Sequence, residues 1–199
     1  MFISKLKFNT NLKNPGIRAV MKDLKNPYEL HRTIMRAFPE NLDKSKERVL
    51  FRKSDNNDHV IVLSKHSQNW NFLSCDYGEA KTKEFENDFA RVSNRVIKLD
   101  ILLNATKRIN GKRIGLSKLE LEKWFPDKMQ KCGFQVVEFN INDIHIEKFI
   151  KAKHKQTFMV SHVTAYGKIK DAELFSKVYQ EGVGSGKGYG YGMINFKVI

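Results

Sequence analysis

The first half of the chain alternates between strand and helix patterns. Apolar and polar residues alternate over residues 2–9, which is typical of a strand with one buried face. A helical pattern runs from Pro27 to about Phe38, with Asn26 as a good N-cap and an apolar stripe at helical spacing. Further strands are predicted at 48–53, 59–63 and 70–75, and a weakly patterned helix at 84–92.

The second half shows a similar order of patterns. A helix is predicted after Ser117, with Leu119 among its apolar residues, and Pro126 is expected to break or kink it. Another helix is predicted at 171–180, and strands at 96–104, 134–141, 145–152, 157–167 and 193–199. We therefore predict an α+β fold of two tandem ferredoxin-like (βαββαβ) domains, covering residues 1–94 and 95–199.

The chain carries a large positive charge. It has 199 residues, with 36 Lys and Arg against 22 Asp and Glu, which gives a formal net charge of +14. Such a surplus favours a polyanionic partner, most often nucleic acid, although solubility alone is the alternative explanation. Hydrophobic residues make up 41% of the chain, which is enough for a folded core.

Several classes of protein are disfavoured by simple absences in the sequence. No apolar run is long enough to span a membrane, and the first ten residues alternate instead of forming a signal peptide. Cys75 and Cys132 are far apart, which disfavours a disulfide scaffold and a zinc site. The six histidines show no metal-ligand spacing, so no metal or cofactor is implied. We expect a cytoplasmic protein without a membrane partner.

Glycine is concentrated near the end of the chain, where six of the twelve glycines fall within residues 182–192. Glycine lets backbone N–H groups approach a phosphate closely, Lys187 adds charge, and Tyr189 and Tyr191 offer rings for stacking on bases. The spacing fits neither a Walker A loop nor GxGxxG, and a flexible linker or a helix cap is the alternative. The candidate nucleic-acid-binding residues of this loop are Gly184, Lys187, Tyr189 and Gly190.

Two basic segments could also hold nucleic acid. In residues 106–114, Asn110-Gly111 predicts a tight hairpin turn that places Arg108 opposite Arg113. Like charges in that register are destabilising unless an anion lies between them. The candidates are Lys107, Arg108, Lys112 and Arg113 here, and Lys148, Lys151, Lys153 and Lys155 on the later hairpin. The alternative is that both segments are merely solvated.

The glycine loop matches the G-h-G-x5-G-x-G signature of the CRISPR repeat-associated RNA-binding proteins. Together with residues 1–5, Tyr28-Glu29-Leu30-His31 and Phe38-Pro39, it makes the chain resemble the CasE family, the Cascade endoribonucleases of type I-E CRISPR systems. The resemblance implies two ferredoxin-like domains and metal-independent cleavage of CRISPR repeat RNA, with no cofactor. It also implies that the cleaved RNA stays bound and that the other Cascade subunits are partners.

Tyr28 and His31 are three residues apart, so they are neighbours on one helical face. Cleavage by the RNA 2′-OH needs a base, an acid and positive charge on the phosphorane. The resemblance implies that His31 is the general acid or base and Tyr28 its helper, without deciding which acts as base. It also places a cation at Arg36, although Arg36 lies about 140° from His31 on an ideal helix. Arg32 is the alternative, and we rank Arg36 first.

Two other functions fit parts of the sequence. A non-catalytic CRISPR RNA-binding subunit of the same superfamily would keep the glycine loop and the charge without needing Tyr28 and His31. An unrelated domain such as an RNA recognition motif would need an aromatic RNP1-like strand, and the sequence contains none. We therefore predict an endoribonuclease, with the non-catalytic subunit as the alternative.

Overall fold

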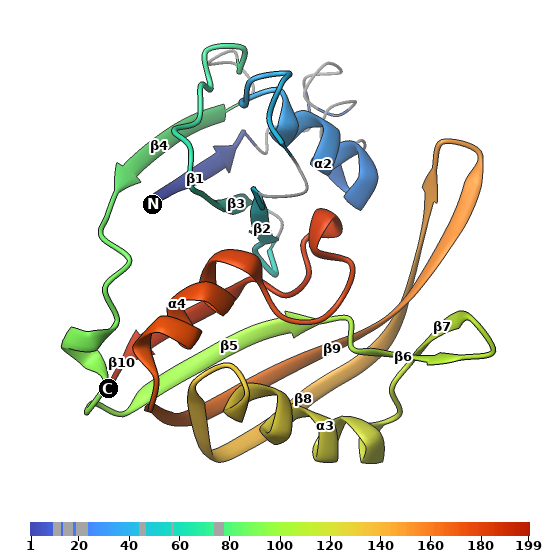
Figure 1. Cartoon of the computed structure of the whole chain (residues 1–199). Coiled ribbons are helices and arrows are strands. Elements are labelled where there is room, and N and C mark those ends of the chain that lie inside the picture. The colour runs from blue at the N-terminus through green and yellow to red at the C-terminus, as the bar shows by residue number, and fades with distance from the viewer. Residues whose placement is uncertain (10–12, 14–17, 19–23, 44–46, 57, 74–77) are drawn as a thin grey trace. The chain divides into compact units, whose positions relative to one another are not determined.

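The computed structural model describes residues 1–9, 13, 18, 24–43, 47–56, 58–73 and 78–199 (Figure 1). The chain divides into two compact units. The first contains residues 1–86 together with 149–156 and 188–190. The second contains residues 87–148, 157–187 and 191–199. Two short segments from late in the sequence thus belong to the first unit, and one of them comes from the glycine-rich loop.

The first unit is built on a four-stranded antiparallel sheet. Its strands are β1 (Phe2–Phe8), β2 (Leu50–Lys53), β3 (His59–Ser64) and β4 (Gly78–Glu84), in the order β2-β3-β1-β4. The helix α2 (Pro27–Met35) contributes Leu30 and Ile34 to the core, where they join Leu6, Val60 and Val62. The strand alternation predicted at residues 2–9 is confirmed, because Leu6 and Phe8 are buried and Lys5 and Lys7 are exposed.

The second unit has a sheet of the same connectivity, in the order β10-β5-β9-β8. Its strands are β5 (Ile97–Leu103), β8 (Phe134–Lys151), β9 (His154–Ile169) and β10 (Ile194–Val198), and its helices are α3 (Lys118–Gln130) and α4 (Ala172–Glu181). The hairpin of β6 (Thr106–Ile109) and β7 (Lys112–Gly115) is inserted before α3, and the short helices η1 (Ala90–Val92) and η2 (Lys187–Tyr189) lie in connections. In both sheets the fourth strand pairs with the first, as in a ferredoxin-like fold, so the predicted fold is confirmed.

The structure corrects two predicted elements of the first half. Residues 70–73 form a turn instead of a strand, and residues 74 and 75 of that prediction lie outside the described residues. Trp70 nevertheless belongs to the core. Its indole N–H donates to the buried Ser4 Oγ at 3.0 Å. The helix predicted at 84–92 is also wrong, because only the three-residue η1 forms there.

The second half differs from its predicted pattern in three places. The strands predicted at 134–141 and 145–152 are a single strand, β8, of 18 residues. Pro126 does not end α3, although it removes one backbone hydrogen bond, because Phe125 and Met129 are fully buried on either side of it. Leu119 is 72% exposed and is not part of the core. Within the described residues, no helix is long and apolar enough to cross a membrane.

Candidate functional site

One helix of the first unit carries both Tyr28 and His31. The N-cap residue Asn26 accepts the Tyr28 backbone N–H at 2.9 Å through Oδ1. Its Nδ2 donates to the Ile150 carbonyl at 3.0 Å, so the same side chain fixes the start of α2 and ties it to the end of β8. Tyr28 and His31 are half-buried beside the fully buried stripe of α2. The helix therefore presents both side chains at the edge of the core, as their spacing predicts.

His31 lies among aromatic rings. The Phe51 ring of β2 is stacked at 6.4 Å between centroids, and the Tyr189 ring is tilted at 6.5 Å. Tyr189 packs in turn on Phe149, at 5.0 Å. Each of four other histidines faces a carboxylate, namely His59, His66, His145 and His162.

The tip of the glycine-rich loop approaches His31 closely. A Cβ atom on Gly188 would lie 3.7 Å from the His31 Cε1, which is ordinary contact distance. Gly190 has φ +93°, which strains any residue with a side chain, and a Cβ there would lie 3.0 Å from the Phe51 Cε2. The glycine at position 190 therefore lets the loop turn against the same ring that stacks on His31.

Tyr28 and His31 open onto a pocket of about 730 Å³, which is within the range of pockets that hold small ligands, roughly 300–1,000 Å³. Both candidate cations line it as well. The helix ends at Met35, and the Arg36 side chain lies over the Phe72 ring, with Cζ 4.5 Å from the centroid. Arg32 is held differently, since its Nη1 binds the Glu29 Oε2 at 3.0 Å. The pocket lining is Tyr28, His31, Arg32, Met35, Arg36, Phe38, Pro39, Glu40 and Phe72.

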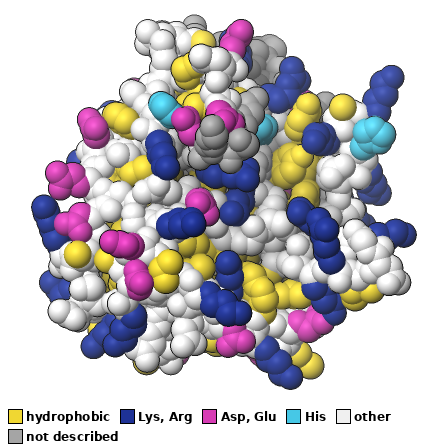
Figure 2. All heavy atoms as spheres, viewed as in Figure 1, with side chains coloured by type: hydrophobic (Ala, Val, Ile, Leu, Met, Phe, Trp, Pro, Cys, Tyr) yellow, Lys and Arg dark blue, Asp and Glu magenta, His cyan; other side chains and the backbone are white. Residues whose placement is uncertain are grey.

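A strongly basic pocket of about 580 Å³ lies in the second unit. The register of β6 and β7 pairs Arg108 with Arg113, as predicted, and both side chains line this pocket. Three lysines that sequence reasoning missed complete it, namely Lys128 on α3, Lys131 at the C-cap of α3 and Lys177 on α4. Among the described lining residues, the other charged groups are Lys187 and Glu181. Excess positive charge also marks the molecular face in Figure 2, where Lys and Arg side chains recur among fewer Asp and Glu.

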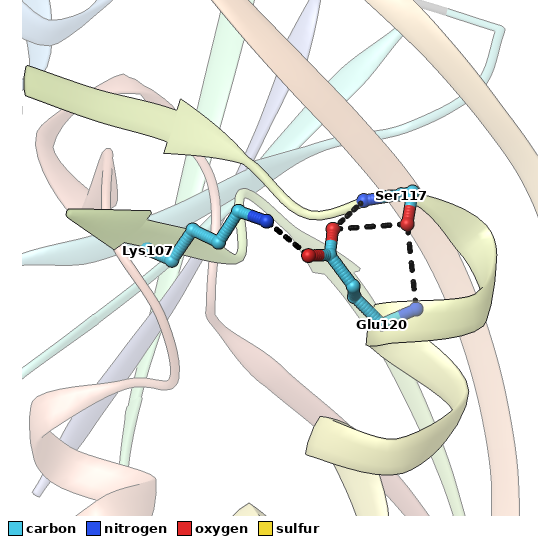
Figure 3. Close-up of polar contacts among 3 residues, drawn as sticks. All are labelled: Lys107, Ser117 and Glu120. Atoms are coloured by element: carbon cyan, nitrogen blue, oxygen red, sulfur yellow. Dashed lines mark hydrogen bonds and ion pairs between the residues drawn. The ribbon is translucent and has the colours of Figure 1, made fainter. Parts of the chain in front are cut away.

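Lys107, one of the predicted RNA-binding cations, has an internal partner (Figure 3). Its Nζ forms an ion pair with the Glu120 carboxylate, which also accepts the Ser117 backbone N–H at 2.9 Å in a capping box at the start of α3. The bond from Lys107, followed by those from Ser117, lowers the pKa of Glu120 to about 2. The Lys107 charge is therefore already matched inside the protein.

Parts of the glycine-rich loop are tied down by their own backbone. The Val183 N–H donates to the Gly192 carbonyl at 2.8 Å, and the Gly192 N–H donates to the Leu102 carbonyl at 2.7 Å. The prediction that Tyr191 offers a stacking surface is wrong, because this residue is only 2% exposed. Its hydroxyl donates to the Glu147 Oε2 at 2.5 Å, and burial, with that bond, raises the Tyr191 pKa well above its usual range.

Known proteins resemble this chain in both sequence and structure. The family described as "CRISPR associated protein" matches residues 1–197. The chain belongs to this family. This CRISPR associated protein is 27% identical to the CRISPR-associated endoribonuclease Cse3 of Thermus thermophilus over 202 residues, which cover 92% of this chain and 95% of the relative. The resemblance to CasE is confirmed by these matches, since Cse3 is another name for CasE.

Solved structures share the fold of this CRISPR associated protein. A structure of Cse3 bound to a 19-nucleotide RNA matches with a TM-score of 0.83 and 24% identity, and the match covers 99% of this chain and 100% of that one. A chain of a CRISPR RNA-guided surveillance complex in a pre-nicking state matches with a TM-score of 0.77 and 19% identity, over all of both chains. These likenesses establish the ferredoxin-like architecture.

The predicted residues of this CRISPR associated protein fall into separate groups. The pocket of the first unit holds Tyr28, His31, Arg32 and Arg36, and the basic pocket of the second unit holds Arg108, Arg113, Gly184 and Lys187. Lys151, Lys153 and Lys155 are exposed on the tip of the β8–β9 hairpin, in the first unit. Lys112 is exposed on β7 and does not line the basic pocket.

Sequence reasoning missed the aromatic residues that surround the catalytic candidates. Phe51, Phe72 and Phe149 look like ordinary core residues in the sequence, and no local signal separates them from the chain's other phenylalanines. The three pocket lysines of the helices were also missed, although Lys128 and Lys131 are three apart and share a helical face. Among the described residues, no group of three or more His, Cys, Asp or Glu side chains could hold a metal ion.

Proposed function

We propose that this chain is a cytoplasmic, metal-independent endoribonuclease that cleaves the repeat hairpin of precursor CRISPR RNA by 2′-OH attack. The cleaved RNA stays bound and is carried into the Cascade surveillance complex with the other subunits. The observation that carries the proposal is the pocket that joins Tyr28 and His31 with the cations Arg32 and Arg36. The relation to the endoribonuclease Cse3 supports the same activity.

Cleavage of RNA by its 2′-OH needs two proton transfers and a positive charge beside the reacting phosphate. The 2′-oxygen attacks the adjacent phosphorus as its proton leaves, and the bond to the 5′-oxygen breaks as that oxygen gains a proton. His31 and Tyr28 share these transfers, because an imidazole that titrates near neutral pH can serve in either direction. Arg36 stabilises the negative charge that develops on the phosphorane oxygens. The products are a 2′,3′-cyclic phosphate and a 5′-hydroxyl.

RNA binding is assigned to the basic groups of both units. The basic pocket of the second unit concentrates cations from the β6–β7 hairpin, α3, α4 and the glycine-rich loop, an arrangement suited to phosphates. Double-stranded RNA is held mostly by its shape and its backbone, so this grip should tolerate changes in stem sequence. The exposed lysines at the hairpin tip lie in the same unit as His31 and supply further phosphate contacts.

The test uses a labelled repeat hairpin, an excess of protein and EDTA. Wild-type protein should cleave it once, and His31→Ala should slow single-turnover cleavage about 10²–10⁴-fold while leaving RNA affinity unchanged. His145→Ala is the matched control, because His145 is exposed on β8 and bound to Asp143, and it should cleave at the wild-type rate.

Three outcomes would contradict the proposed activity. A strict requirement for added Mg²⁺ would refute the metal-independent mechanism. A wild-type rate for His31→Ala would show that this histidine is structural. Tight binding of the repeat without any cleavage by the wild-type protein would favour the alternative, a non-catalytic CRISPR RNA-binding subunit.

A further inference from the structure

The turn formed by residues 70–73 brings an aromatic ring to the pocket that contains His31. Phe72 is half-buried and packs against the core of the first unit beside Trp70, at 6.1 Å between ring centroids. Trp70 is itself anchored by its hydrogen bond to Ser4 on β1. The position of Phe72 is therefore set by the core, while part of its ring remains at the pocket wall.

Phe72 contacts Arg36 in a geometry that suits a planar cation. The Arg36 Cζ lies 4.5 Å from the ring centroid, within the range of a cation–π contact. A guanidinium that rests its face on a ring keeps its N–H donors around the edge of its plane, where they can bind a phosphate in a bidentate manner. A lysine ammonium is a point charge on a flexible stem and lacks this combination.

Arg32, the rival cation of the pocket, is placed less favourably for catalysis. Its Nη1 is engaged by Glu29, and its side chain is 63% exposed. Its Cζ lies 5.9 Å from the Tyr28 ring, farther than Arg36 lies from Phe72. Both arginines are exposed, but an arginine bound to a carboxylate is a weaker source of positive charge for a reacting phosphate than one held on a ring.

We propose that Phe72 is a positioning residue for RNA cleavage, which holds the Arg36 guanidinium in the wall of the pocket so that Arg36 can stabilise the negative charge that develops on the reacting phosphate. This inference rests on the proposed endoribonuclease function and assigns a role to a residue outside the catalytic candidates. Phe72 acts through Arg36 and does not itself contact the RNA. Its contribution therefore belongs to the cleavage step and depends on the presence of Arg36.

The experiment compares Phe72→Leu with Phe72→Tyr in the full-length chain. Leucine keeps an apolar side chain against the core but removes the aromatic face, whereas tyrosine keeps the face. Single-turnover cleavage in EDTA should fall roughly 2- to 30-fold for Phe72→Leu, the factor that corresponds to a cation–π contact. Phe72→Tyr should cleave at nearly the wild-type rate, and both variants should bind the repeat with wild-type affinity.

A double-mutant cycle with Arg36→Ala separates positioning from a structural role. Once Arg36 is absent, Phe72→Leu should cause no further loss of rate, because the two residues act as one unit. A wild-type rate for Phe72→Leu, or rate losses that multiply in the double variant, would overturn the proposal. A parallel fall in affinity and rate would also overturn it, because Phe72 would then contact RNA directly. Absence of cleavage by the wild-type protein would instead refute the proposed function, so the two failures are distinguishable.

Discussion

Replacing both Arg108 and Arg113 by alanine tests whether the basic pocket of the second unit binds RNA phosphates. The two arginines are directly opposite each other on β6 and β7, and both line the pocket. Like charges in this position repel each other in the free protein and are attracted to a shared anion in the complex. The double variant should therefore bind RNA more weakly, while the free protein keeps or slightly raises its melting temperature.

The magnitude follows from counterion release. Each lost phosphate contact reduces the slope of log K against log[salt] by about 0.7 for single-stranded nucleic acid and about 0.9 for B-DNA. Two lost contacts reduce the slope by about 1.4–1.8. Between 50 and 200 mM salt, the affinity advantage of the wild-type protein over the variant should accordingly shrink by about 7- to 12-fold.

The assay is a salt titration of affinity with several stem sequences, together with thermal melts of both proteins. Lys123→Ala is the matched control, because Lys123 is exposed on α3 but does not line the pocket. The affinity loss should be similar for every stem sequence, since phosphate contacts carry no base information. An unchanged salt slope in the double variant would show that Arg108 and Arg113 do not bind phosphates. The lysines at the β8–β9 hairpin tip would then be the better candidates.

Two further predictions concern the loop and the start of α3. Gly190→Ala should lower the free energy of unfolding by about 1–3 kcal/mol, because φ is +93° and a Cβ would press on the Phe51 ring. A denaturant titration in which the variant matches the wild-type protein would contradict this prediction. Since the folded pKa of Glu120 is about 2 against an ordinary 4.5, its stabilisation is complete above about pH 4.5 and is lost as pH falls toward 2. Glu120→Gln should remove that part of the loss of stability at low pH, and thermal melts between pH 2 and 6 measure it. If the variant and the wild-type protein show the same pH profile, the ion pair between Glu120 and Lys107 is not the cause of the acid sensitivity.

The fold was predictable from the sequence because most elements have strong local signals. Asn26 and Ser117 start helices, Asn110-Gly111 forms a hairpin turn with positive φ at both residues, and alternation marks β1. The failures occurred where tertiary contacts override local pattern. Trp70, Phe72 and Leu73 are apolar because they pack against the core from a turn, and periodicity alone does not distinguish that from a strand.

The candidate site was predictable only in part. The spacing of Tyr28 and His31 places them together on one helix, and the resemblance added Arg36. The helical wheel counted against Arg36, which keeps helical backbone angles as the C-cap of α2, but its side chain lies over the Phe72 ring and lines the same pocket as His31. No sequence pattern links Arg36 with Phe72, since only the folded turn brings the two side chains together.

The surroundings of His31 have a consequence for the order in which the first unit can assemble during synthesis. Gly188 follows His31 by 157 positions, yet both lie in the first unit and their atoms would be in contact distance if position 188 carried a Cβ. At about 5–20 residues per second, translation needs roughly 8–30 s to cover that interval. The helix with His31 therefore leaves the ribosome long before the loop that packs beside it exists. A nascent chain therefore cannot complete the surroundings of His31 until residues 188–190 have been made.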